Sequence, residues 1–481
     1  MNLVHVSALL ALVASCGSLS ARVPTPRSEE VLYHVSFPAP QTQHVSISTV
    51  FPTGGRDELV VSLPTWRPGR YHILNPAGTL RGFTARTPDG TQLQARKTAV
   101  STWAITTLGA PRVVIDYTIY ANSLGDRTRH VDPTHAFLSG SSVFLYSDRL
   151  RSAPLTVEVD LPTGWDIATG LERVPGREDA VAAPNYDVLV DSPLEIGLHD
   201  RVTFTVADTP HEFIYWPPGI ERDDERIIED ATKIIEAQRA IFGRLPYERY
   251  VFLVHGSEAR GGTEHLNSTI MQTSRAALEG SRENDDAYKG FLSLLAHEFF
   301  HTWNVKQLRP AGIHPYDYQH ENLSDMLWVC EGTTSYYAAL TRTRAELTKP
   351  DKYLEGLGKA AAGLLRSPAT AVQSVAEASR DAWIDARNAD SANSSVDIYG
   401  KGSLVSFCLD MEVRKRTENR VSLDDVMRTM FERFPLDGPG YRRQDMVAVL
   451  DELTGTEFSG WFASYVTGTD KLPYRESVGA V

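Results

Sequence analysis

The chain has 481 residues, 42% of them apolar and 23% charged, which is ordinary for a globular protein of roughly two to four domains. The formal net charge of -13 and the lack of Lys/Arg runs argue against nucleic acids and anionic membrane surfaces as partners. Three cysteines, Cys16, Cys330 and Cys408, exclude a framework of several disulfides.

Residues 1–21 have the character of a secretory signal peptide. Residues 3–15 are apolar and small, too short to span a bilayer, and a Pro-containing linker follows. Val13-Ala14-Ser15-Cys16 is similar to a bacterial lipobox, although no positive charge precedes it. We expect an exported protein, either in the bacterial periplasm or held to a membrane facing it by a lipid on Cys16; a plain signal peptide is the alternative.

Apolar residues alternate with polar ones in several short runs between residues 30 and 212. The runs lie at residues 113–119, 155–161 and 202–206, and turn-forming clusters such as Thr53-Gly54-Gly55 separate them. Short alternating strands between turns are typical of antiparallel sheets with one buried face. The sequence therefore predicts an N-terminal antiparallel β-domain over residues 30–212.

The period becomes helical after Pro217. An amphipathic helix is predicted at residues 225–242, a buried strand at residues 250–254, and further helices around residue 297 and over residues 331–347. Beyond Pro350 the pattern is mainly helical. We expect a multidomain α+β protein with a catalytic domain at residues 213–350 and a helical C-terminal domain at residues 351–481.

His297-Glu298-Phe299-Phe300-His301 is an HExxH sequence in a strongly apolar segment. Four residues of helix make a little more than one turn, so both histidines project from the same face. Two neutral imidazoles can take adjacent corners of one tetrahedral Zn²⁺ ion, with Glu298 beside them as general base. Burying these groups would be costly without a partner, so we expect one Zn²⁺ per chain rather than a structural pair of histidines.

Two downstream carboxylates compete to be the third zinc ligand. Glu321 follows His301 after 19 residues and begins a segment similar to the ligand helix of thermolysin-like endopeptidases. Glu331 lies ten residues later, inside Leu327–Tyr336, which resembles the LWLNEGFASY ligand helix of alanyl-type zinc aminopeptidases.

Two further segments resemble those aminopeptidases. Gly261-Gly262-Thr263-Glu264-His265 is similar to their GAMEN segment, which lies along the substrate and whose Glu holds the free α-amino group. Ile398-Tyr399-Gly400-Lys401-Gly402 is similar to their YxKG segment, whose Tyr donates a hydrogen bond to the tetrahedral intermediate. Taken alone, Glu264 is better explained as part of a solvated turn, and Tyr399 as a half-buried aromatic residue. Their order around one HExxH favours Glu331.

The run His297–Pro310, HEFFHTWNVKQLRP, resembles the diagnostic run of the glycyl aminopeptidase family of zinc metallopeptidases. Trp66–Tyr71 is similar to an element of that family's β-domain, and the resemblance extends from about residue 30 to Tyr474. It implies a thermolysin-like catalytic domain over residues 213–350. Many members continue into a PDZ domain, which we expect this chain to lack because it ends at Val481.

The resemblance implies hydrolysis of N-terminal Gly or Ala from peptides. Zinc would be bound by His297, His301 and Glu331, with Glu298 as base and Tyr399 stabilising the oxyanion. Glu264 would pair with the substrate's α-ammonium, and Gly261 and Gly262, lacking a Cβ, would let the peptide approach closely. The alternatives are an endopeptidase that uses Glu321 and, less favoured, a catalytically inactive exported binding protein.

Overall fold

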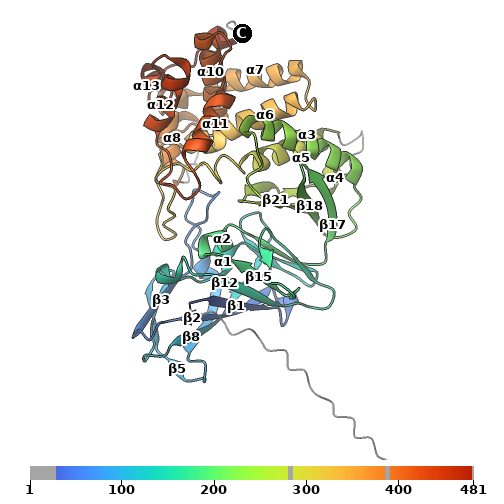
Figure 1. Cartoon of the computed structure of the whole chain (residues 1–481), viewed down its shortest axis with the longest axis vertical. Coiled ribbons are helices and arrows are strands. Elements are labelled where there is room, and N and C mark those ends of the chain that lie inside the picture. The colour runs from blue at the N-terminus through green and yellow to red at the C-terminus, as the bar shows by residue number, and fades with distance from the viewer. Residues whose placement is uncertain (1–28, 280–284, 385–389, 479–481) are drawn as a thin grey trace, which may run out of the picture.

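The computed structural model describes residues 29–279, 285–384 and 390–478. The predicted signal peptide and Cys16 therefore lie outside the described residues. An N-terminal β-domain occupies one end of the molecule, a mixed sheet with its helices lies in the middle, and a group of helices forms the other end (Figure 1).

The largest sheet of the β-domain has eight strands. All its pairings are antiparallel as predicted, except that the first strand pairs in parallel with β12. Buried and less buried residues alternate along its strands, so one face packs into the core. The order is β14 (Glu172–Arg173), β15 (Ala180–Ala183), β12 (Leu155–Asp160), β1 (Val31–Ser36), β2 (His44–Pro52), β8 (Arg112–Tyr120), β4 (Leu80–Arg86) and β5 (Gln92–Leu93).

Two smaller sheets and several short helical turns complete the β-domain. One sheet has the order β13 (Asp166–Ala168), β16 (Leu194–Gly197), β11 (His135–Leu138), β10 (Arg129–Val131) and β9 (Asn122–Ser123). The other has the order β3 (Glu58–Ser62), β7 (Thr102–Thr106) and β6 (Ala95–Ala99). The helical turns are η1 (Pro40–Thr42), η2 (Pro76–Thr79), α1 (Gly140–Val143), η3 (Asp148–Leu150) and α2 (Tyr186–Val190).

The middle of the molecule is a five-stranded sheet. Its order is β17 (Asp200–Val206), β18 (Thr209–Trp216), β19 (Tyr250–Gly256), β21 (Ser268–Thr273) and β20 (Gly261–Glu264). β17 was expected in the N-terminal β-domain, but it is the edge strand of this sheet and pairs with β18. The alternation of its residues predicts a strand correctly and carries no information about which sheet the strand joins.

Helices cover this sheet, and one of them carries the HExxH sequence. They are α3 (Asp224–Phe242), α4 (Arg275–Leu278), α5 (Asp285–Phe300), the π-helical turn η5 (Trp328–Thr333) and α6 (Thr334–Arg344). The C-terminal half of α5 is buried on most sides, as its apolar sequence predicts. α5 therefore holds its polar residues in a fixed position inside the core.

The described residues from Pro350 onward contain helices and no strand. These are α7 (Pro350–Arg366), η6 (Pro368–Ala371), α8 (Val375–Asp381), α9 (Ser391–Ser394), α10 (Gly400–Thr417), α11 (Leu423–Arg433), α12 (Arg443–Thr454), α13 (Ser459–Tyr465) and α14 (Tyr474–Val478). The predicted fold class, an N-terminal β-domain followed by α+β and mainly helical parts, is confirmed. No helix among the described residues combines the length and apolar character needed to cross a membrane.

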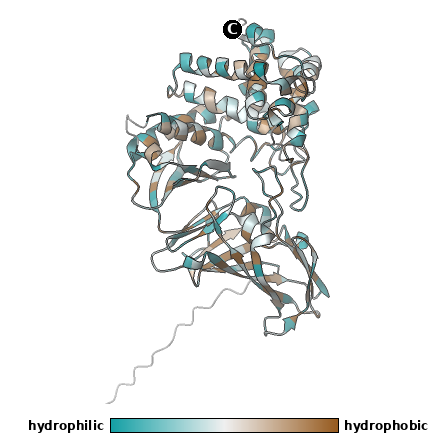
Figure 2. Ribbon diagram, turned by 180° about the vertical axis from the view of Figure 1, so that it is seen from behind, coloured by the Kyte–Doolittle hydropathy of each residue, from teal (hydrophilic) through white to brown (hydrophobic). Residues whose placement is uncertain are grey.

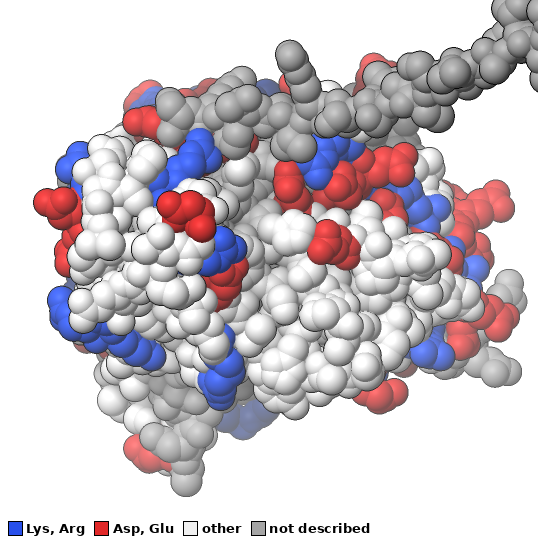
Figure 3. Space-filling view, turned by 90° about the horizontal axis from the view of Figure 1, so that it is seen from below, with Lys and Arg blue, Asp and Glu red and all other residues white. Residues whose placement is uncertain are grey.

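Hydrophobic and hydrophilic residues alternate along many strands of the β-domain (Figure 2). The less buried row of β2 consists of His44, Ser46, Ser48 and Val50, and Ser48 donates a hydrogen bond to Asp116 of β8, which also pairs with Arg86 of β4. Seen from the β-domain end, acidic and basic side chains lie mostly toward the edges of the surface, and the area between them consists largely of uncharged residues (Figure 3).

Two glycines let η5 pack directly on α10. A Cβ at Gly332 would lie 2.4 Å from the Cα of Gly402, and a Cβ at Gly402 would lie 3.0 Å from the Cα of Gly332. Backbone atoms at these distances cannot rotate away as a side chain could. The contact therefore fixes the position of the turn that contains Glu331.

We expect Gly332→Ala to destabilise the protein by about 1–3 kcal/mol, because the added methyl group overpacks a backbone contact. Gly356→Ala is the matched control: a Cβ there meets nothing within 4 Å, and alanine stabilises an exposed helix. Urea unfolding of both variants measures the difference, and a Gly332→Ala protein as stable as wild type would contradict the close packing.

Candidate metal centre and active site

His297, His301 and Glu331 come together as a compact cluster. The Nε2 atoms of the two histidines lie 3.1 Å apart, and Glu331 Oε2 lies 3.7 Å from His297 Nε2 and 3.5 Å from His301 Nε2. Ligand atoms on a tetrahedral ion with bonds of about 2.0–2.1 Å are separated by about 3.3 Å. The three residues therefore fit one small divalent metal ion.

The second nitrogen of His301 is held by the backbone. Its Nδ1 lies 2.8 Å from the carbonyl oxygen of Asn304, which is the arrangement that leaves Nε2 free to bind a metal. Burial alone would lower the pKa of His301, but the charge of Glu331 raises it to about 9. The cluster thus attracts positive charge, as a metal site should.

Glu331 projects from the π-helical turn η5 rather than from a regular α-helix. Such turns occur often at functional sites, since the extra residue changes the direction of the side chains. Asn304 fixes the turn by donating from its side chain to the carbonyl of Val329, at 2.8 Å, and to the hydroxyl of Thr334, at 3.1 Å. The end of the HExxH segment and the Glu331 turn are therefore one hydrogen-bonded unit.

Glu321 lies on an exposed loop outside this cluster. The residues around it do not form the helix that an endopeptidase-type ligand would need, and Glu321 is not part of the cluster with His297 and His301. The geometric basis for the endopeptidase alternative is therefore missing.

Glu298 is buried beneath the edge strand β20. Its side chain is 5% exposed, and burial raises its pKa to about 8. A Cβ at Gly262 would lie 2.4 Å from Glu298 Oε1, so only glycine fits above this carboxylate. Gly262 was expected to face the substrate, yet its carbonyl already accepts a hydrogen bond from Arg127, at 3.0 Å. The absent side chain at Gly262 makes room for Glu298.

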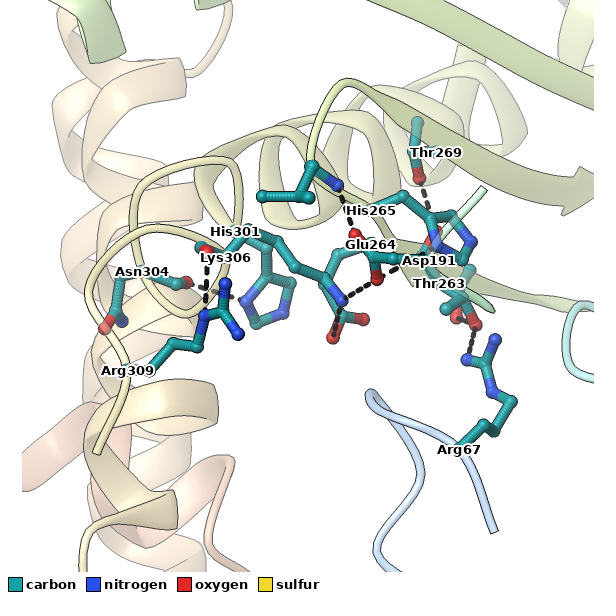
Figure 4. A network of polar contacts seen from close by, with 12 residues as sticks. Arg67, Asp191, Thr263, Glu264, His265, Thr269, His301, Asn304, Lys306 and Arg309 are labelled. Atoms are coloured by element: carbon teal, nitrogen blue, oxygen red, sulfur yellow. Dashed lines mark hydrogen bonds and ion pairs between the residues drawn. The ribbon is translucent and has the colours of Figure 1, made fainter. Parts of the chain in front are cut away.

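Glu264 is 3% exposed and lies in a buried polar network (Figure 4). Lys306 Nζ lies 3.8 Å from Glu264 Oε1 and 2.6 Å from Asp191 Oδ1, and Asp191 accepts a hydrogen bond from the backbone of Leu266. Lys306 and Asp191 thus hold the strand that carries Glu264. Glu264 Oε1 accepts no hydrogen bond from the described residues.

The segment Trp66–Tyr71 of the β-domain closes one side of the site. Tyr71 donates a hydrogen bond to Glu331 Oε1, at 2.9 Å, and Arg67 donates to the hydroxyl of Thr263, at 2.9 Å. A Cβ at Gly69 would lie 2.7 Å from Glu264 Oε1, so the backbone presses against that carboxylate. The roles of Tyr71, Asp191 and Lys306 were not predicted from the sequence. Tyr71 and Lys306 do lie in the two segments that resemble the family, Trp66–Tyr71 and His297–Pro310, whereas nothing in the sequence pointed to Asp191.

Tyr399 lies immediately before α10 at the wall of a cleft. Its ring is 6.0 Å from that of His297, and its side chain is 38% exposed. The cleft has a volume of about 470 Å³, and its lining includes Tyr71, Arg127 and Tyr399. These three residues also contact Glu331, Gly262 and His297, so the cleft opens beside the metal-binding cluster.

The sequence model of the peptidase M61 N-terminal domain matches residues 32–198, and that of the M61 glycyl aminopeptidase matches residues 290–405. The chain belongs to the glycyl aminopeptidase family. It is therefore a metallopeptidase of the aminopeptidase class. Comparison with curated proteins finds no match.

Solved structures agree with this fold. The chain is 28% identical to an aminopeptidase N family protein from Idiomarina loihiensis, covering 93% of this chain and 78% of that one with a TM-score of 0.88. The M1 zinc metallopeptidase from Deinococcus radiodurans is 15% identical, with 92% and 95% covered and a TM-score of 0.58, which shows a shared fold.

We expect Glu331→Ala to remove the bound metal and Glu321→Ala to retain it. Loss of a direct ligand should weaken metal affinity by more than about 100-fold, since loss of an outer partner alone costs about 10–100-fold. Metal measured per mole of each folded variant tests this, with Glu321→Ala as the matched control. The reverse pattern would contradict the assignment of Glu331.

Proposed function

We propose that the protein is a zinc-dependent aminopeptidase that removes N-terminal Gly or Ala from peptides, with His297, His301 and Glu331 as the zinc ligands. Two imidazoles and one carboxylate, with a position left for solvent or substrate, are the donor set of catalytic zinc. Bound zinc lowers the pKa of water toward neutrality and polarises a peptide carbonyl. The spacing of the three ligand atoms supports this proposal.

Glu298 is the proton carrier in this proposal. It lies next to His297 in sequence but does not belong to the three-residue ligand cluster. Burial raises the pKa of this carboxyl group, so its ionised form is a stronger base than an exposed glutamate and can accept a proton from the attacking water and give it to the leaving amine. Gly262 leaves the space against β20 that this carboxylate occupies.

Glu264 carries the preference for a free N-terminus. A buried carboxylate oxygen without a hydrogen-bond donor is unfavourable, and the α-ammonium of a substrate would supply that donor. Gly69 lies against Glu264, and Arg67 is bonded to the neighbouring Thr263, so the β-domain covers one side of this carboxylate. In this proposal, that cover prevents a longer peptide from continuing past Glu264. This unsatisfied and enclosed carboxylate is the observation on which the proposal depends.

The Trp66–Tyr71 segment of the β-domain also supports a preference for a small N-terminal residue in the substrate. Tyr71 donates a hydrogen bond to Glu331, and its ring centroid lies 6.1 Å from that of Trp383. Gly69 and Tyr71 both line the cleft, so a small first side chain of a substrate would fit against them more easily than a bulky one.

We also propose that the protein is exported to the periplasm, where it is either free or attached to a membrane by a lipid on Cys16. This part rests only on the apolar residues 3–15 and the lipobox-like segment that ends at Cys16. It is independent of the catalytic chemistry, because the site residues lie between Arg67 and Tyr399.

We expect the zinc-loaded protein to hydrolyse Gly- and Ala-anilides but not their N-acetylated forms. Acetylation removes the charge that Glu264 would bind, and leaves the scissile bond unchanged. Glu298→Gln should keep the metal and lose about 10²–10⁴ of the rate, since it removes the proton acceptor only. Equal hydrolysis of free and acetylated substrates would contradict the exopeptidase proposal, and an active Glu298→Gln protein would remove Glu298 from the mechanism.

We expect Tyr399→Phe to lower kcat by about 10²–10³ with little change in KM, because its hydroxyl would bind the oxyanion mainly in the transition state. Tyr353→Phe is a matched control, since Tyr353 lies with Tyr399 along a neighbouring pocket. Steady-state kinetics on Ala-anilide separates kcat from KM. A change confined to KM would limit Tyr399 to substrate binding.

A further inference from the structure

A second group of potential metal ligands lies on the β10–β11 hairpin. β10 and β11 pair so that Val131 faces Ala136, and the Asp132 amide donates to the His135 carbonyl at 2.9 Å. Asp132 and His135 are thus opposite one another, and His130 is two residues before Asp132. Because side chains alternate along a strand, all three lie on the same face of the hairpin.

The ligand atoms of these residues are close together. One nitrogen from each imidazole and one oxygen of Asp132 all lie within 4.8 Å of one another, with His130 Nε2 3.3 Å from Asp132 Oδ2. The other oxygen of Asp132 accepts hydrogen bonds from the backbone and hydroxyl of Thr134 and from the backbone of His135. That bonding fixes the carboxylate and leaves Oδ2 directed to His130.

The imidazole of His135 is held on two sides. Its Nδ1 lies 2.7 Å from Glu195 Oε1, and the other oxygen of Glu195 lies 2.9 Å from His255 Nε2. The ring of Trp216 stacks on it with centroids 3.6 Å apart and planes 11° apart. Glu195 is a carboxylate that fixes both the orientation and the protonated nitrogen of His135, the arrangement that supports histidine ligands in metal sites.

The remaining nitrogen of His135 has no hydrogen-bond partner among the described residues. The side chain of His135 is fully buried, and its Nε2 and the Nδ1 of His130 are both unsatisfied. A hydrogen-bonded structural network accounts for Glu195, His255 and His135 Nδ1 but leaves His135 Nε2 unexplained. A buried acceptor without a donor is unfavourable, and a bound metal ion would remove that cost.

We propose that the chain binds a second Zn²⁺ ion, held by His130, Asp132 and Nε2 of His135. Two imidazoles with one carboxylate favour zinc over calcium or magnesium, which prefer all-oxygen sites. The side chains of His130 and Asp132 are 13% and 29% exposed, so the ion can enter and take a solvent molecule as its fourth ligand. The site shares no residue with the His297, His301 and Glu331 cluster.

The role of this ion is structural. The hairpin is linked through Glu195 of β16 to His255 of β19, so the ligands join the β-domain to the central sheet. Binding to the folded state alone stabilises a protein in proportion to the logarithm of the free metal concentration. The proposal does not depend on the peptidase function, since the two clusters are built from different elements.

The test is the zinc content and zinc titration of the full chain. We expect about two zinc ions per wild-type chain, and about one in His130→Ala and in Asp132→Asn. Asp132→Asn removes the anionic oxygen but keeps the side-chain carbonyl that accepts from Thr134, so it guards against misfolding in His130→Ala. Both variants should keep wild-type peptidase activity. Their thermal unfolding midpoints should be lower than that of the zinc-loaded wild type, because the second ion no longer stabilises the folded state.

Two controls make the result decisive. The first control is His34→Ala. His34 is an exposed histidine that pairs with Asp160 at 3.0 Å and belongs to none of the three-residue clusters found among the described residues. This variant should bind both ions. Glu331→Ala should keep the hairpin ion while activity is lost, which separates this site from the catalytic one. A wild-type chain that binds one ion, all of it lost in Glu331→Ala, would overturn the proposal. Unchanged zinc content in both His130→Ala and Asp132→Asn would overturn it as well.

Discussion

The relative position of the His301 imidazole and the turn that carries Glu331 depends on the hydrogen bonds of one buried residue, Asn304. Its carbonyl fixes Nδ1 of His301, and its side-chain amide holds the carbonyl of Val329 and the hydroxyl of Thr334 on either side of Glu331. Asn304 is itself fully buried, so these bonds form away from water. A buried polar group that loses its hydrogen-bond partner destabilises the folded state. Conformations that break these bonds are therefore unfavourable, and His301 and Glu331 keep one relative arrangement.

The substrate-binding side of the site depends on the packing of the β-domain against the central sheet. Asp191 of the β-domain binds Lys306, and both support the strand that carries Glu264. Buried ions of one sign are costly, and the Asp191–Lys306 pair offsets part of that cost beside Glu264. Removal of the β-domain would therefore expose the site and also remove a charge partner from its interior.

The sequence was sufficient where the position of a side chain follows from spacing along a helix or within a short segment. HExxH predicts two imidazoles on one helical face, and the structure places Glu331, and not Glu321, beside them. The residues that were missed make contacts between distant parts of the chain: Tyr71 lies 260 positions from Glu331, and Asp191 lies 115 positions from Lys306. No local period encodes such contacts. The same limit explains β17, whose alternation identified a strand but could not assign its sheet, and Gly262, whose missing side chain makes room for Glu298.

The two histidine clusters hold their imidazoles by different means, and the difference suits different tasks. In the cluster of His297, His301 and Glu331, the outer partner of His301 is a neutral backbone carbonyl, and the negative charge beside its imidazole comes from Glu331. On the hairpin the outer partner of His135 is the carboxylate of Glu195, which also pairs with His255, and Trp216 stacks on the ring of His135. A charged outer partner makes an imidazole a stronger donor and its position more rigid. Rigid, strongly donating ligands suit the structural ion that we propose for the hairpin. In the proposed peptidase mechanism, by contrast, Glu264 and Glu298 have to remain available to the substrate's ammonium group and to the transferred proton.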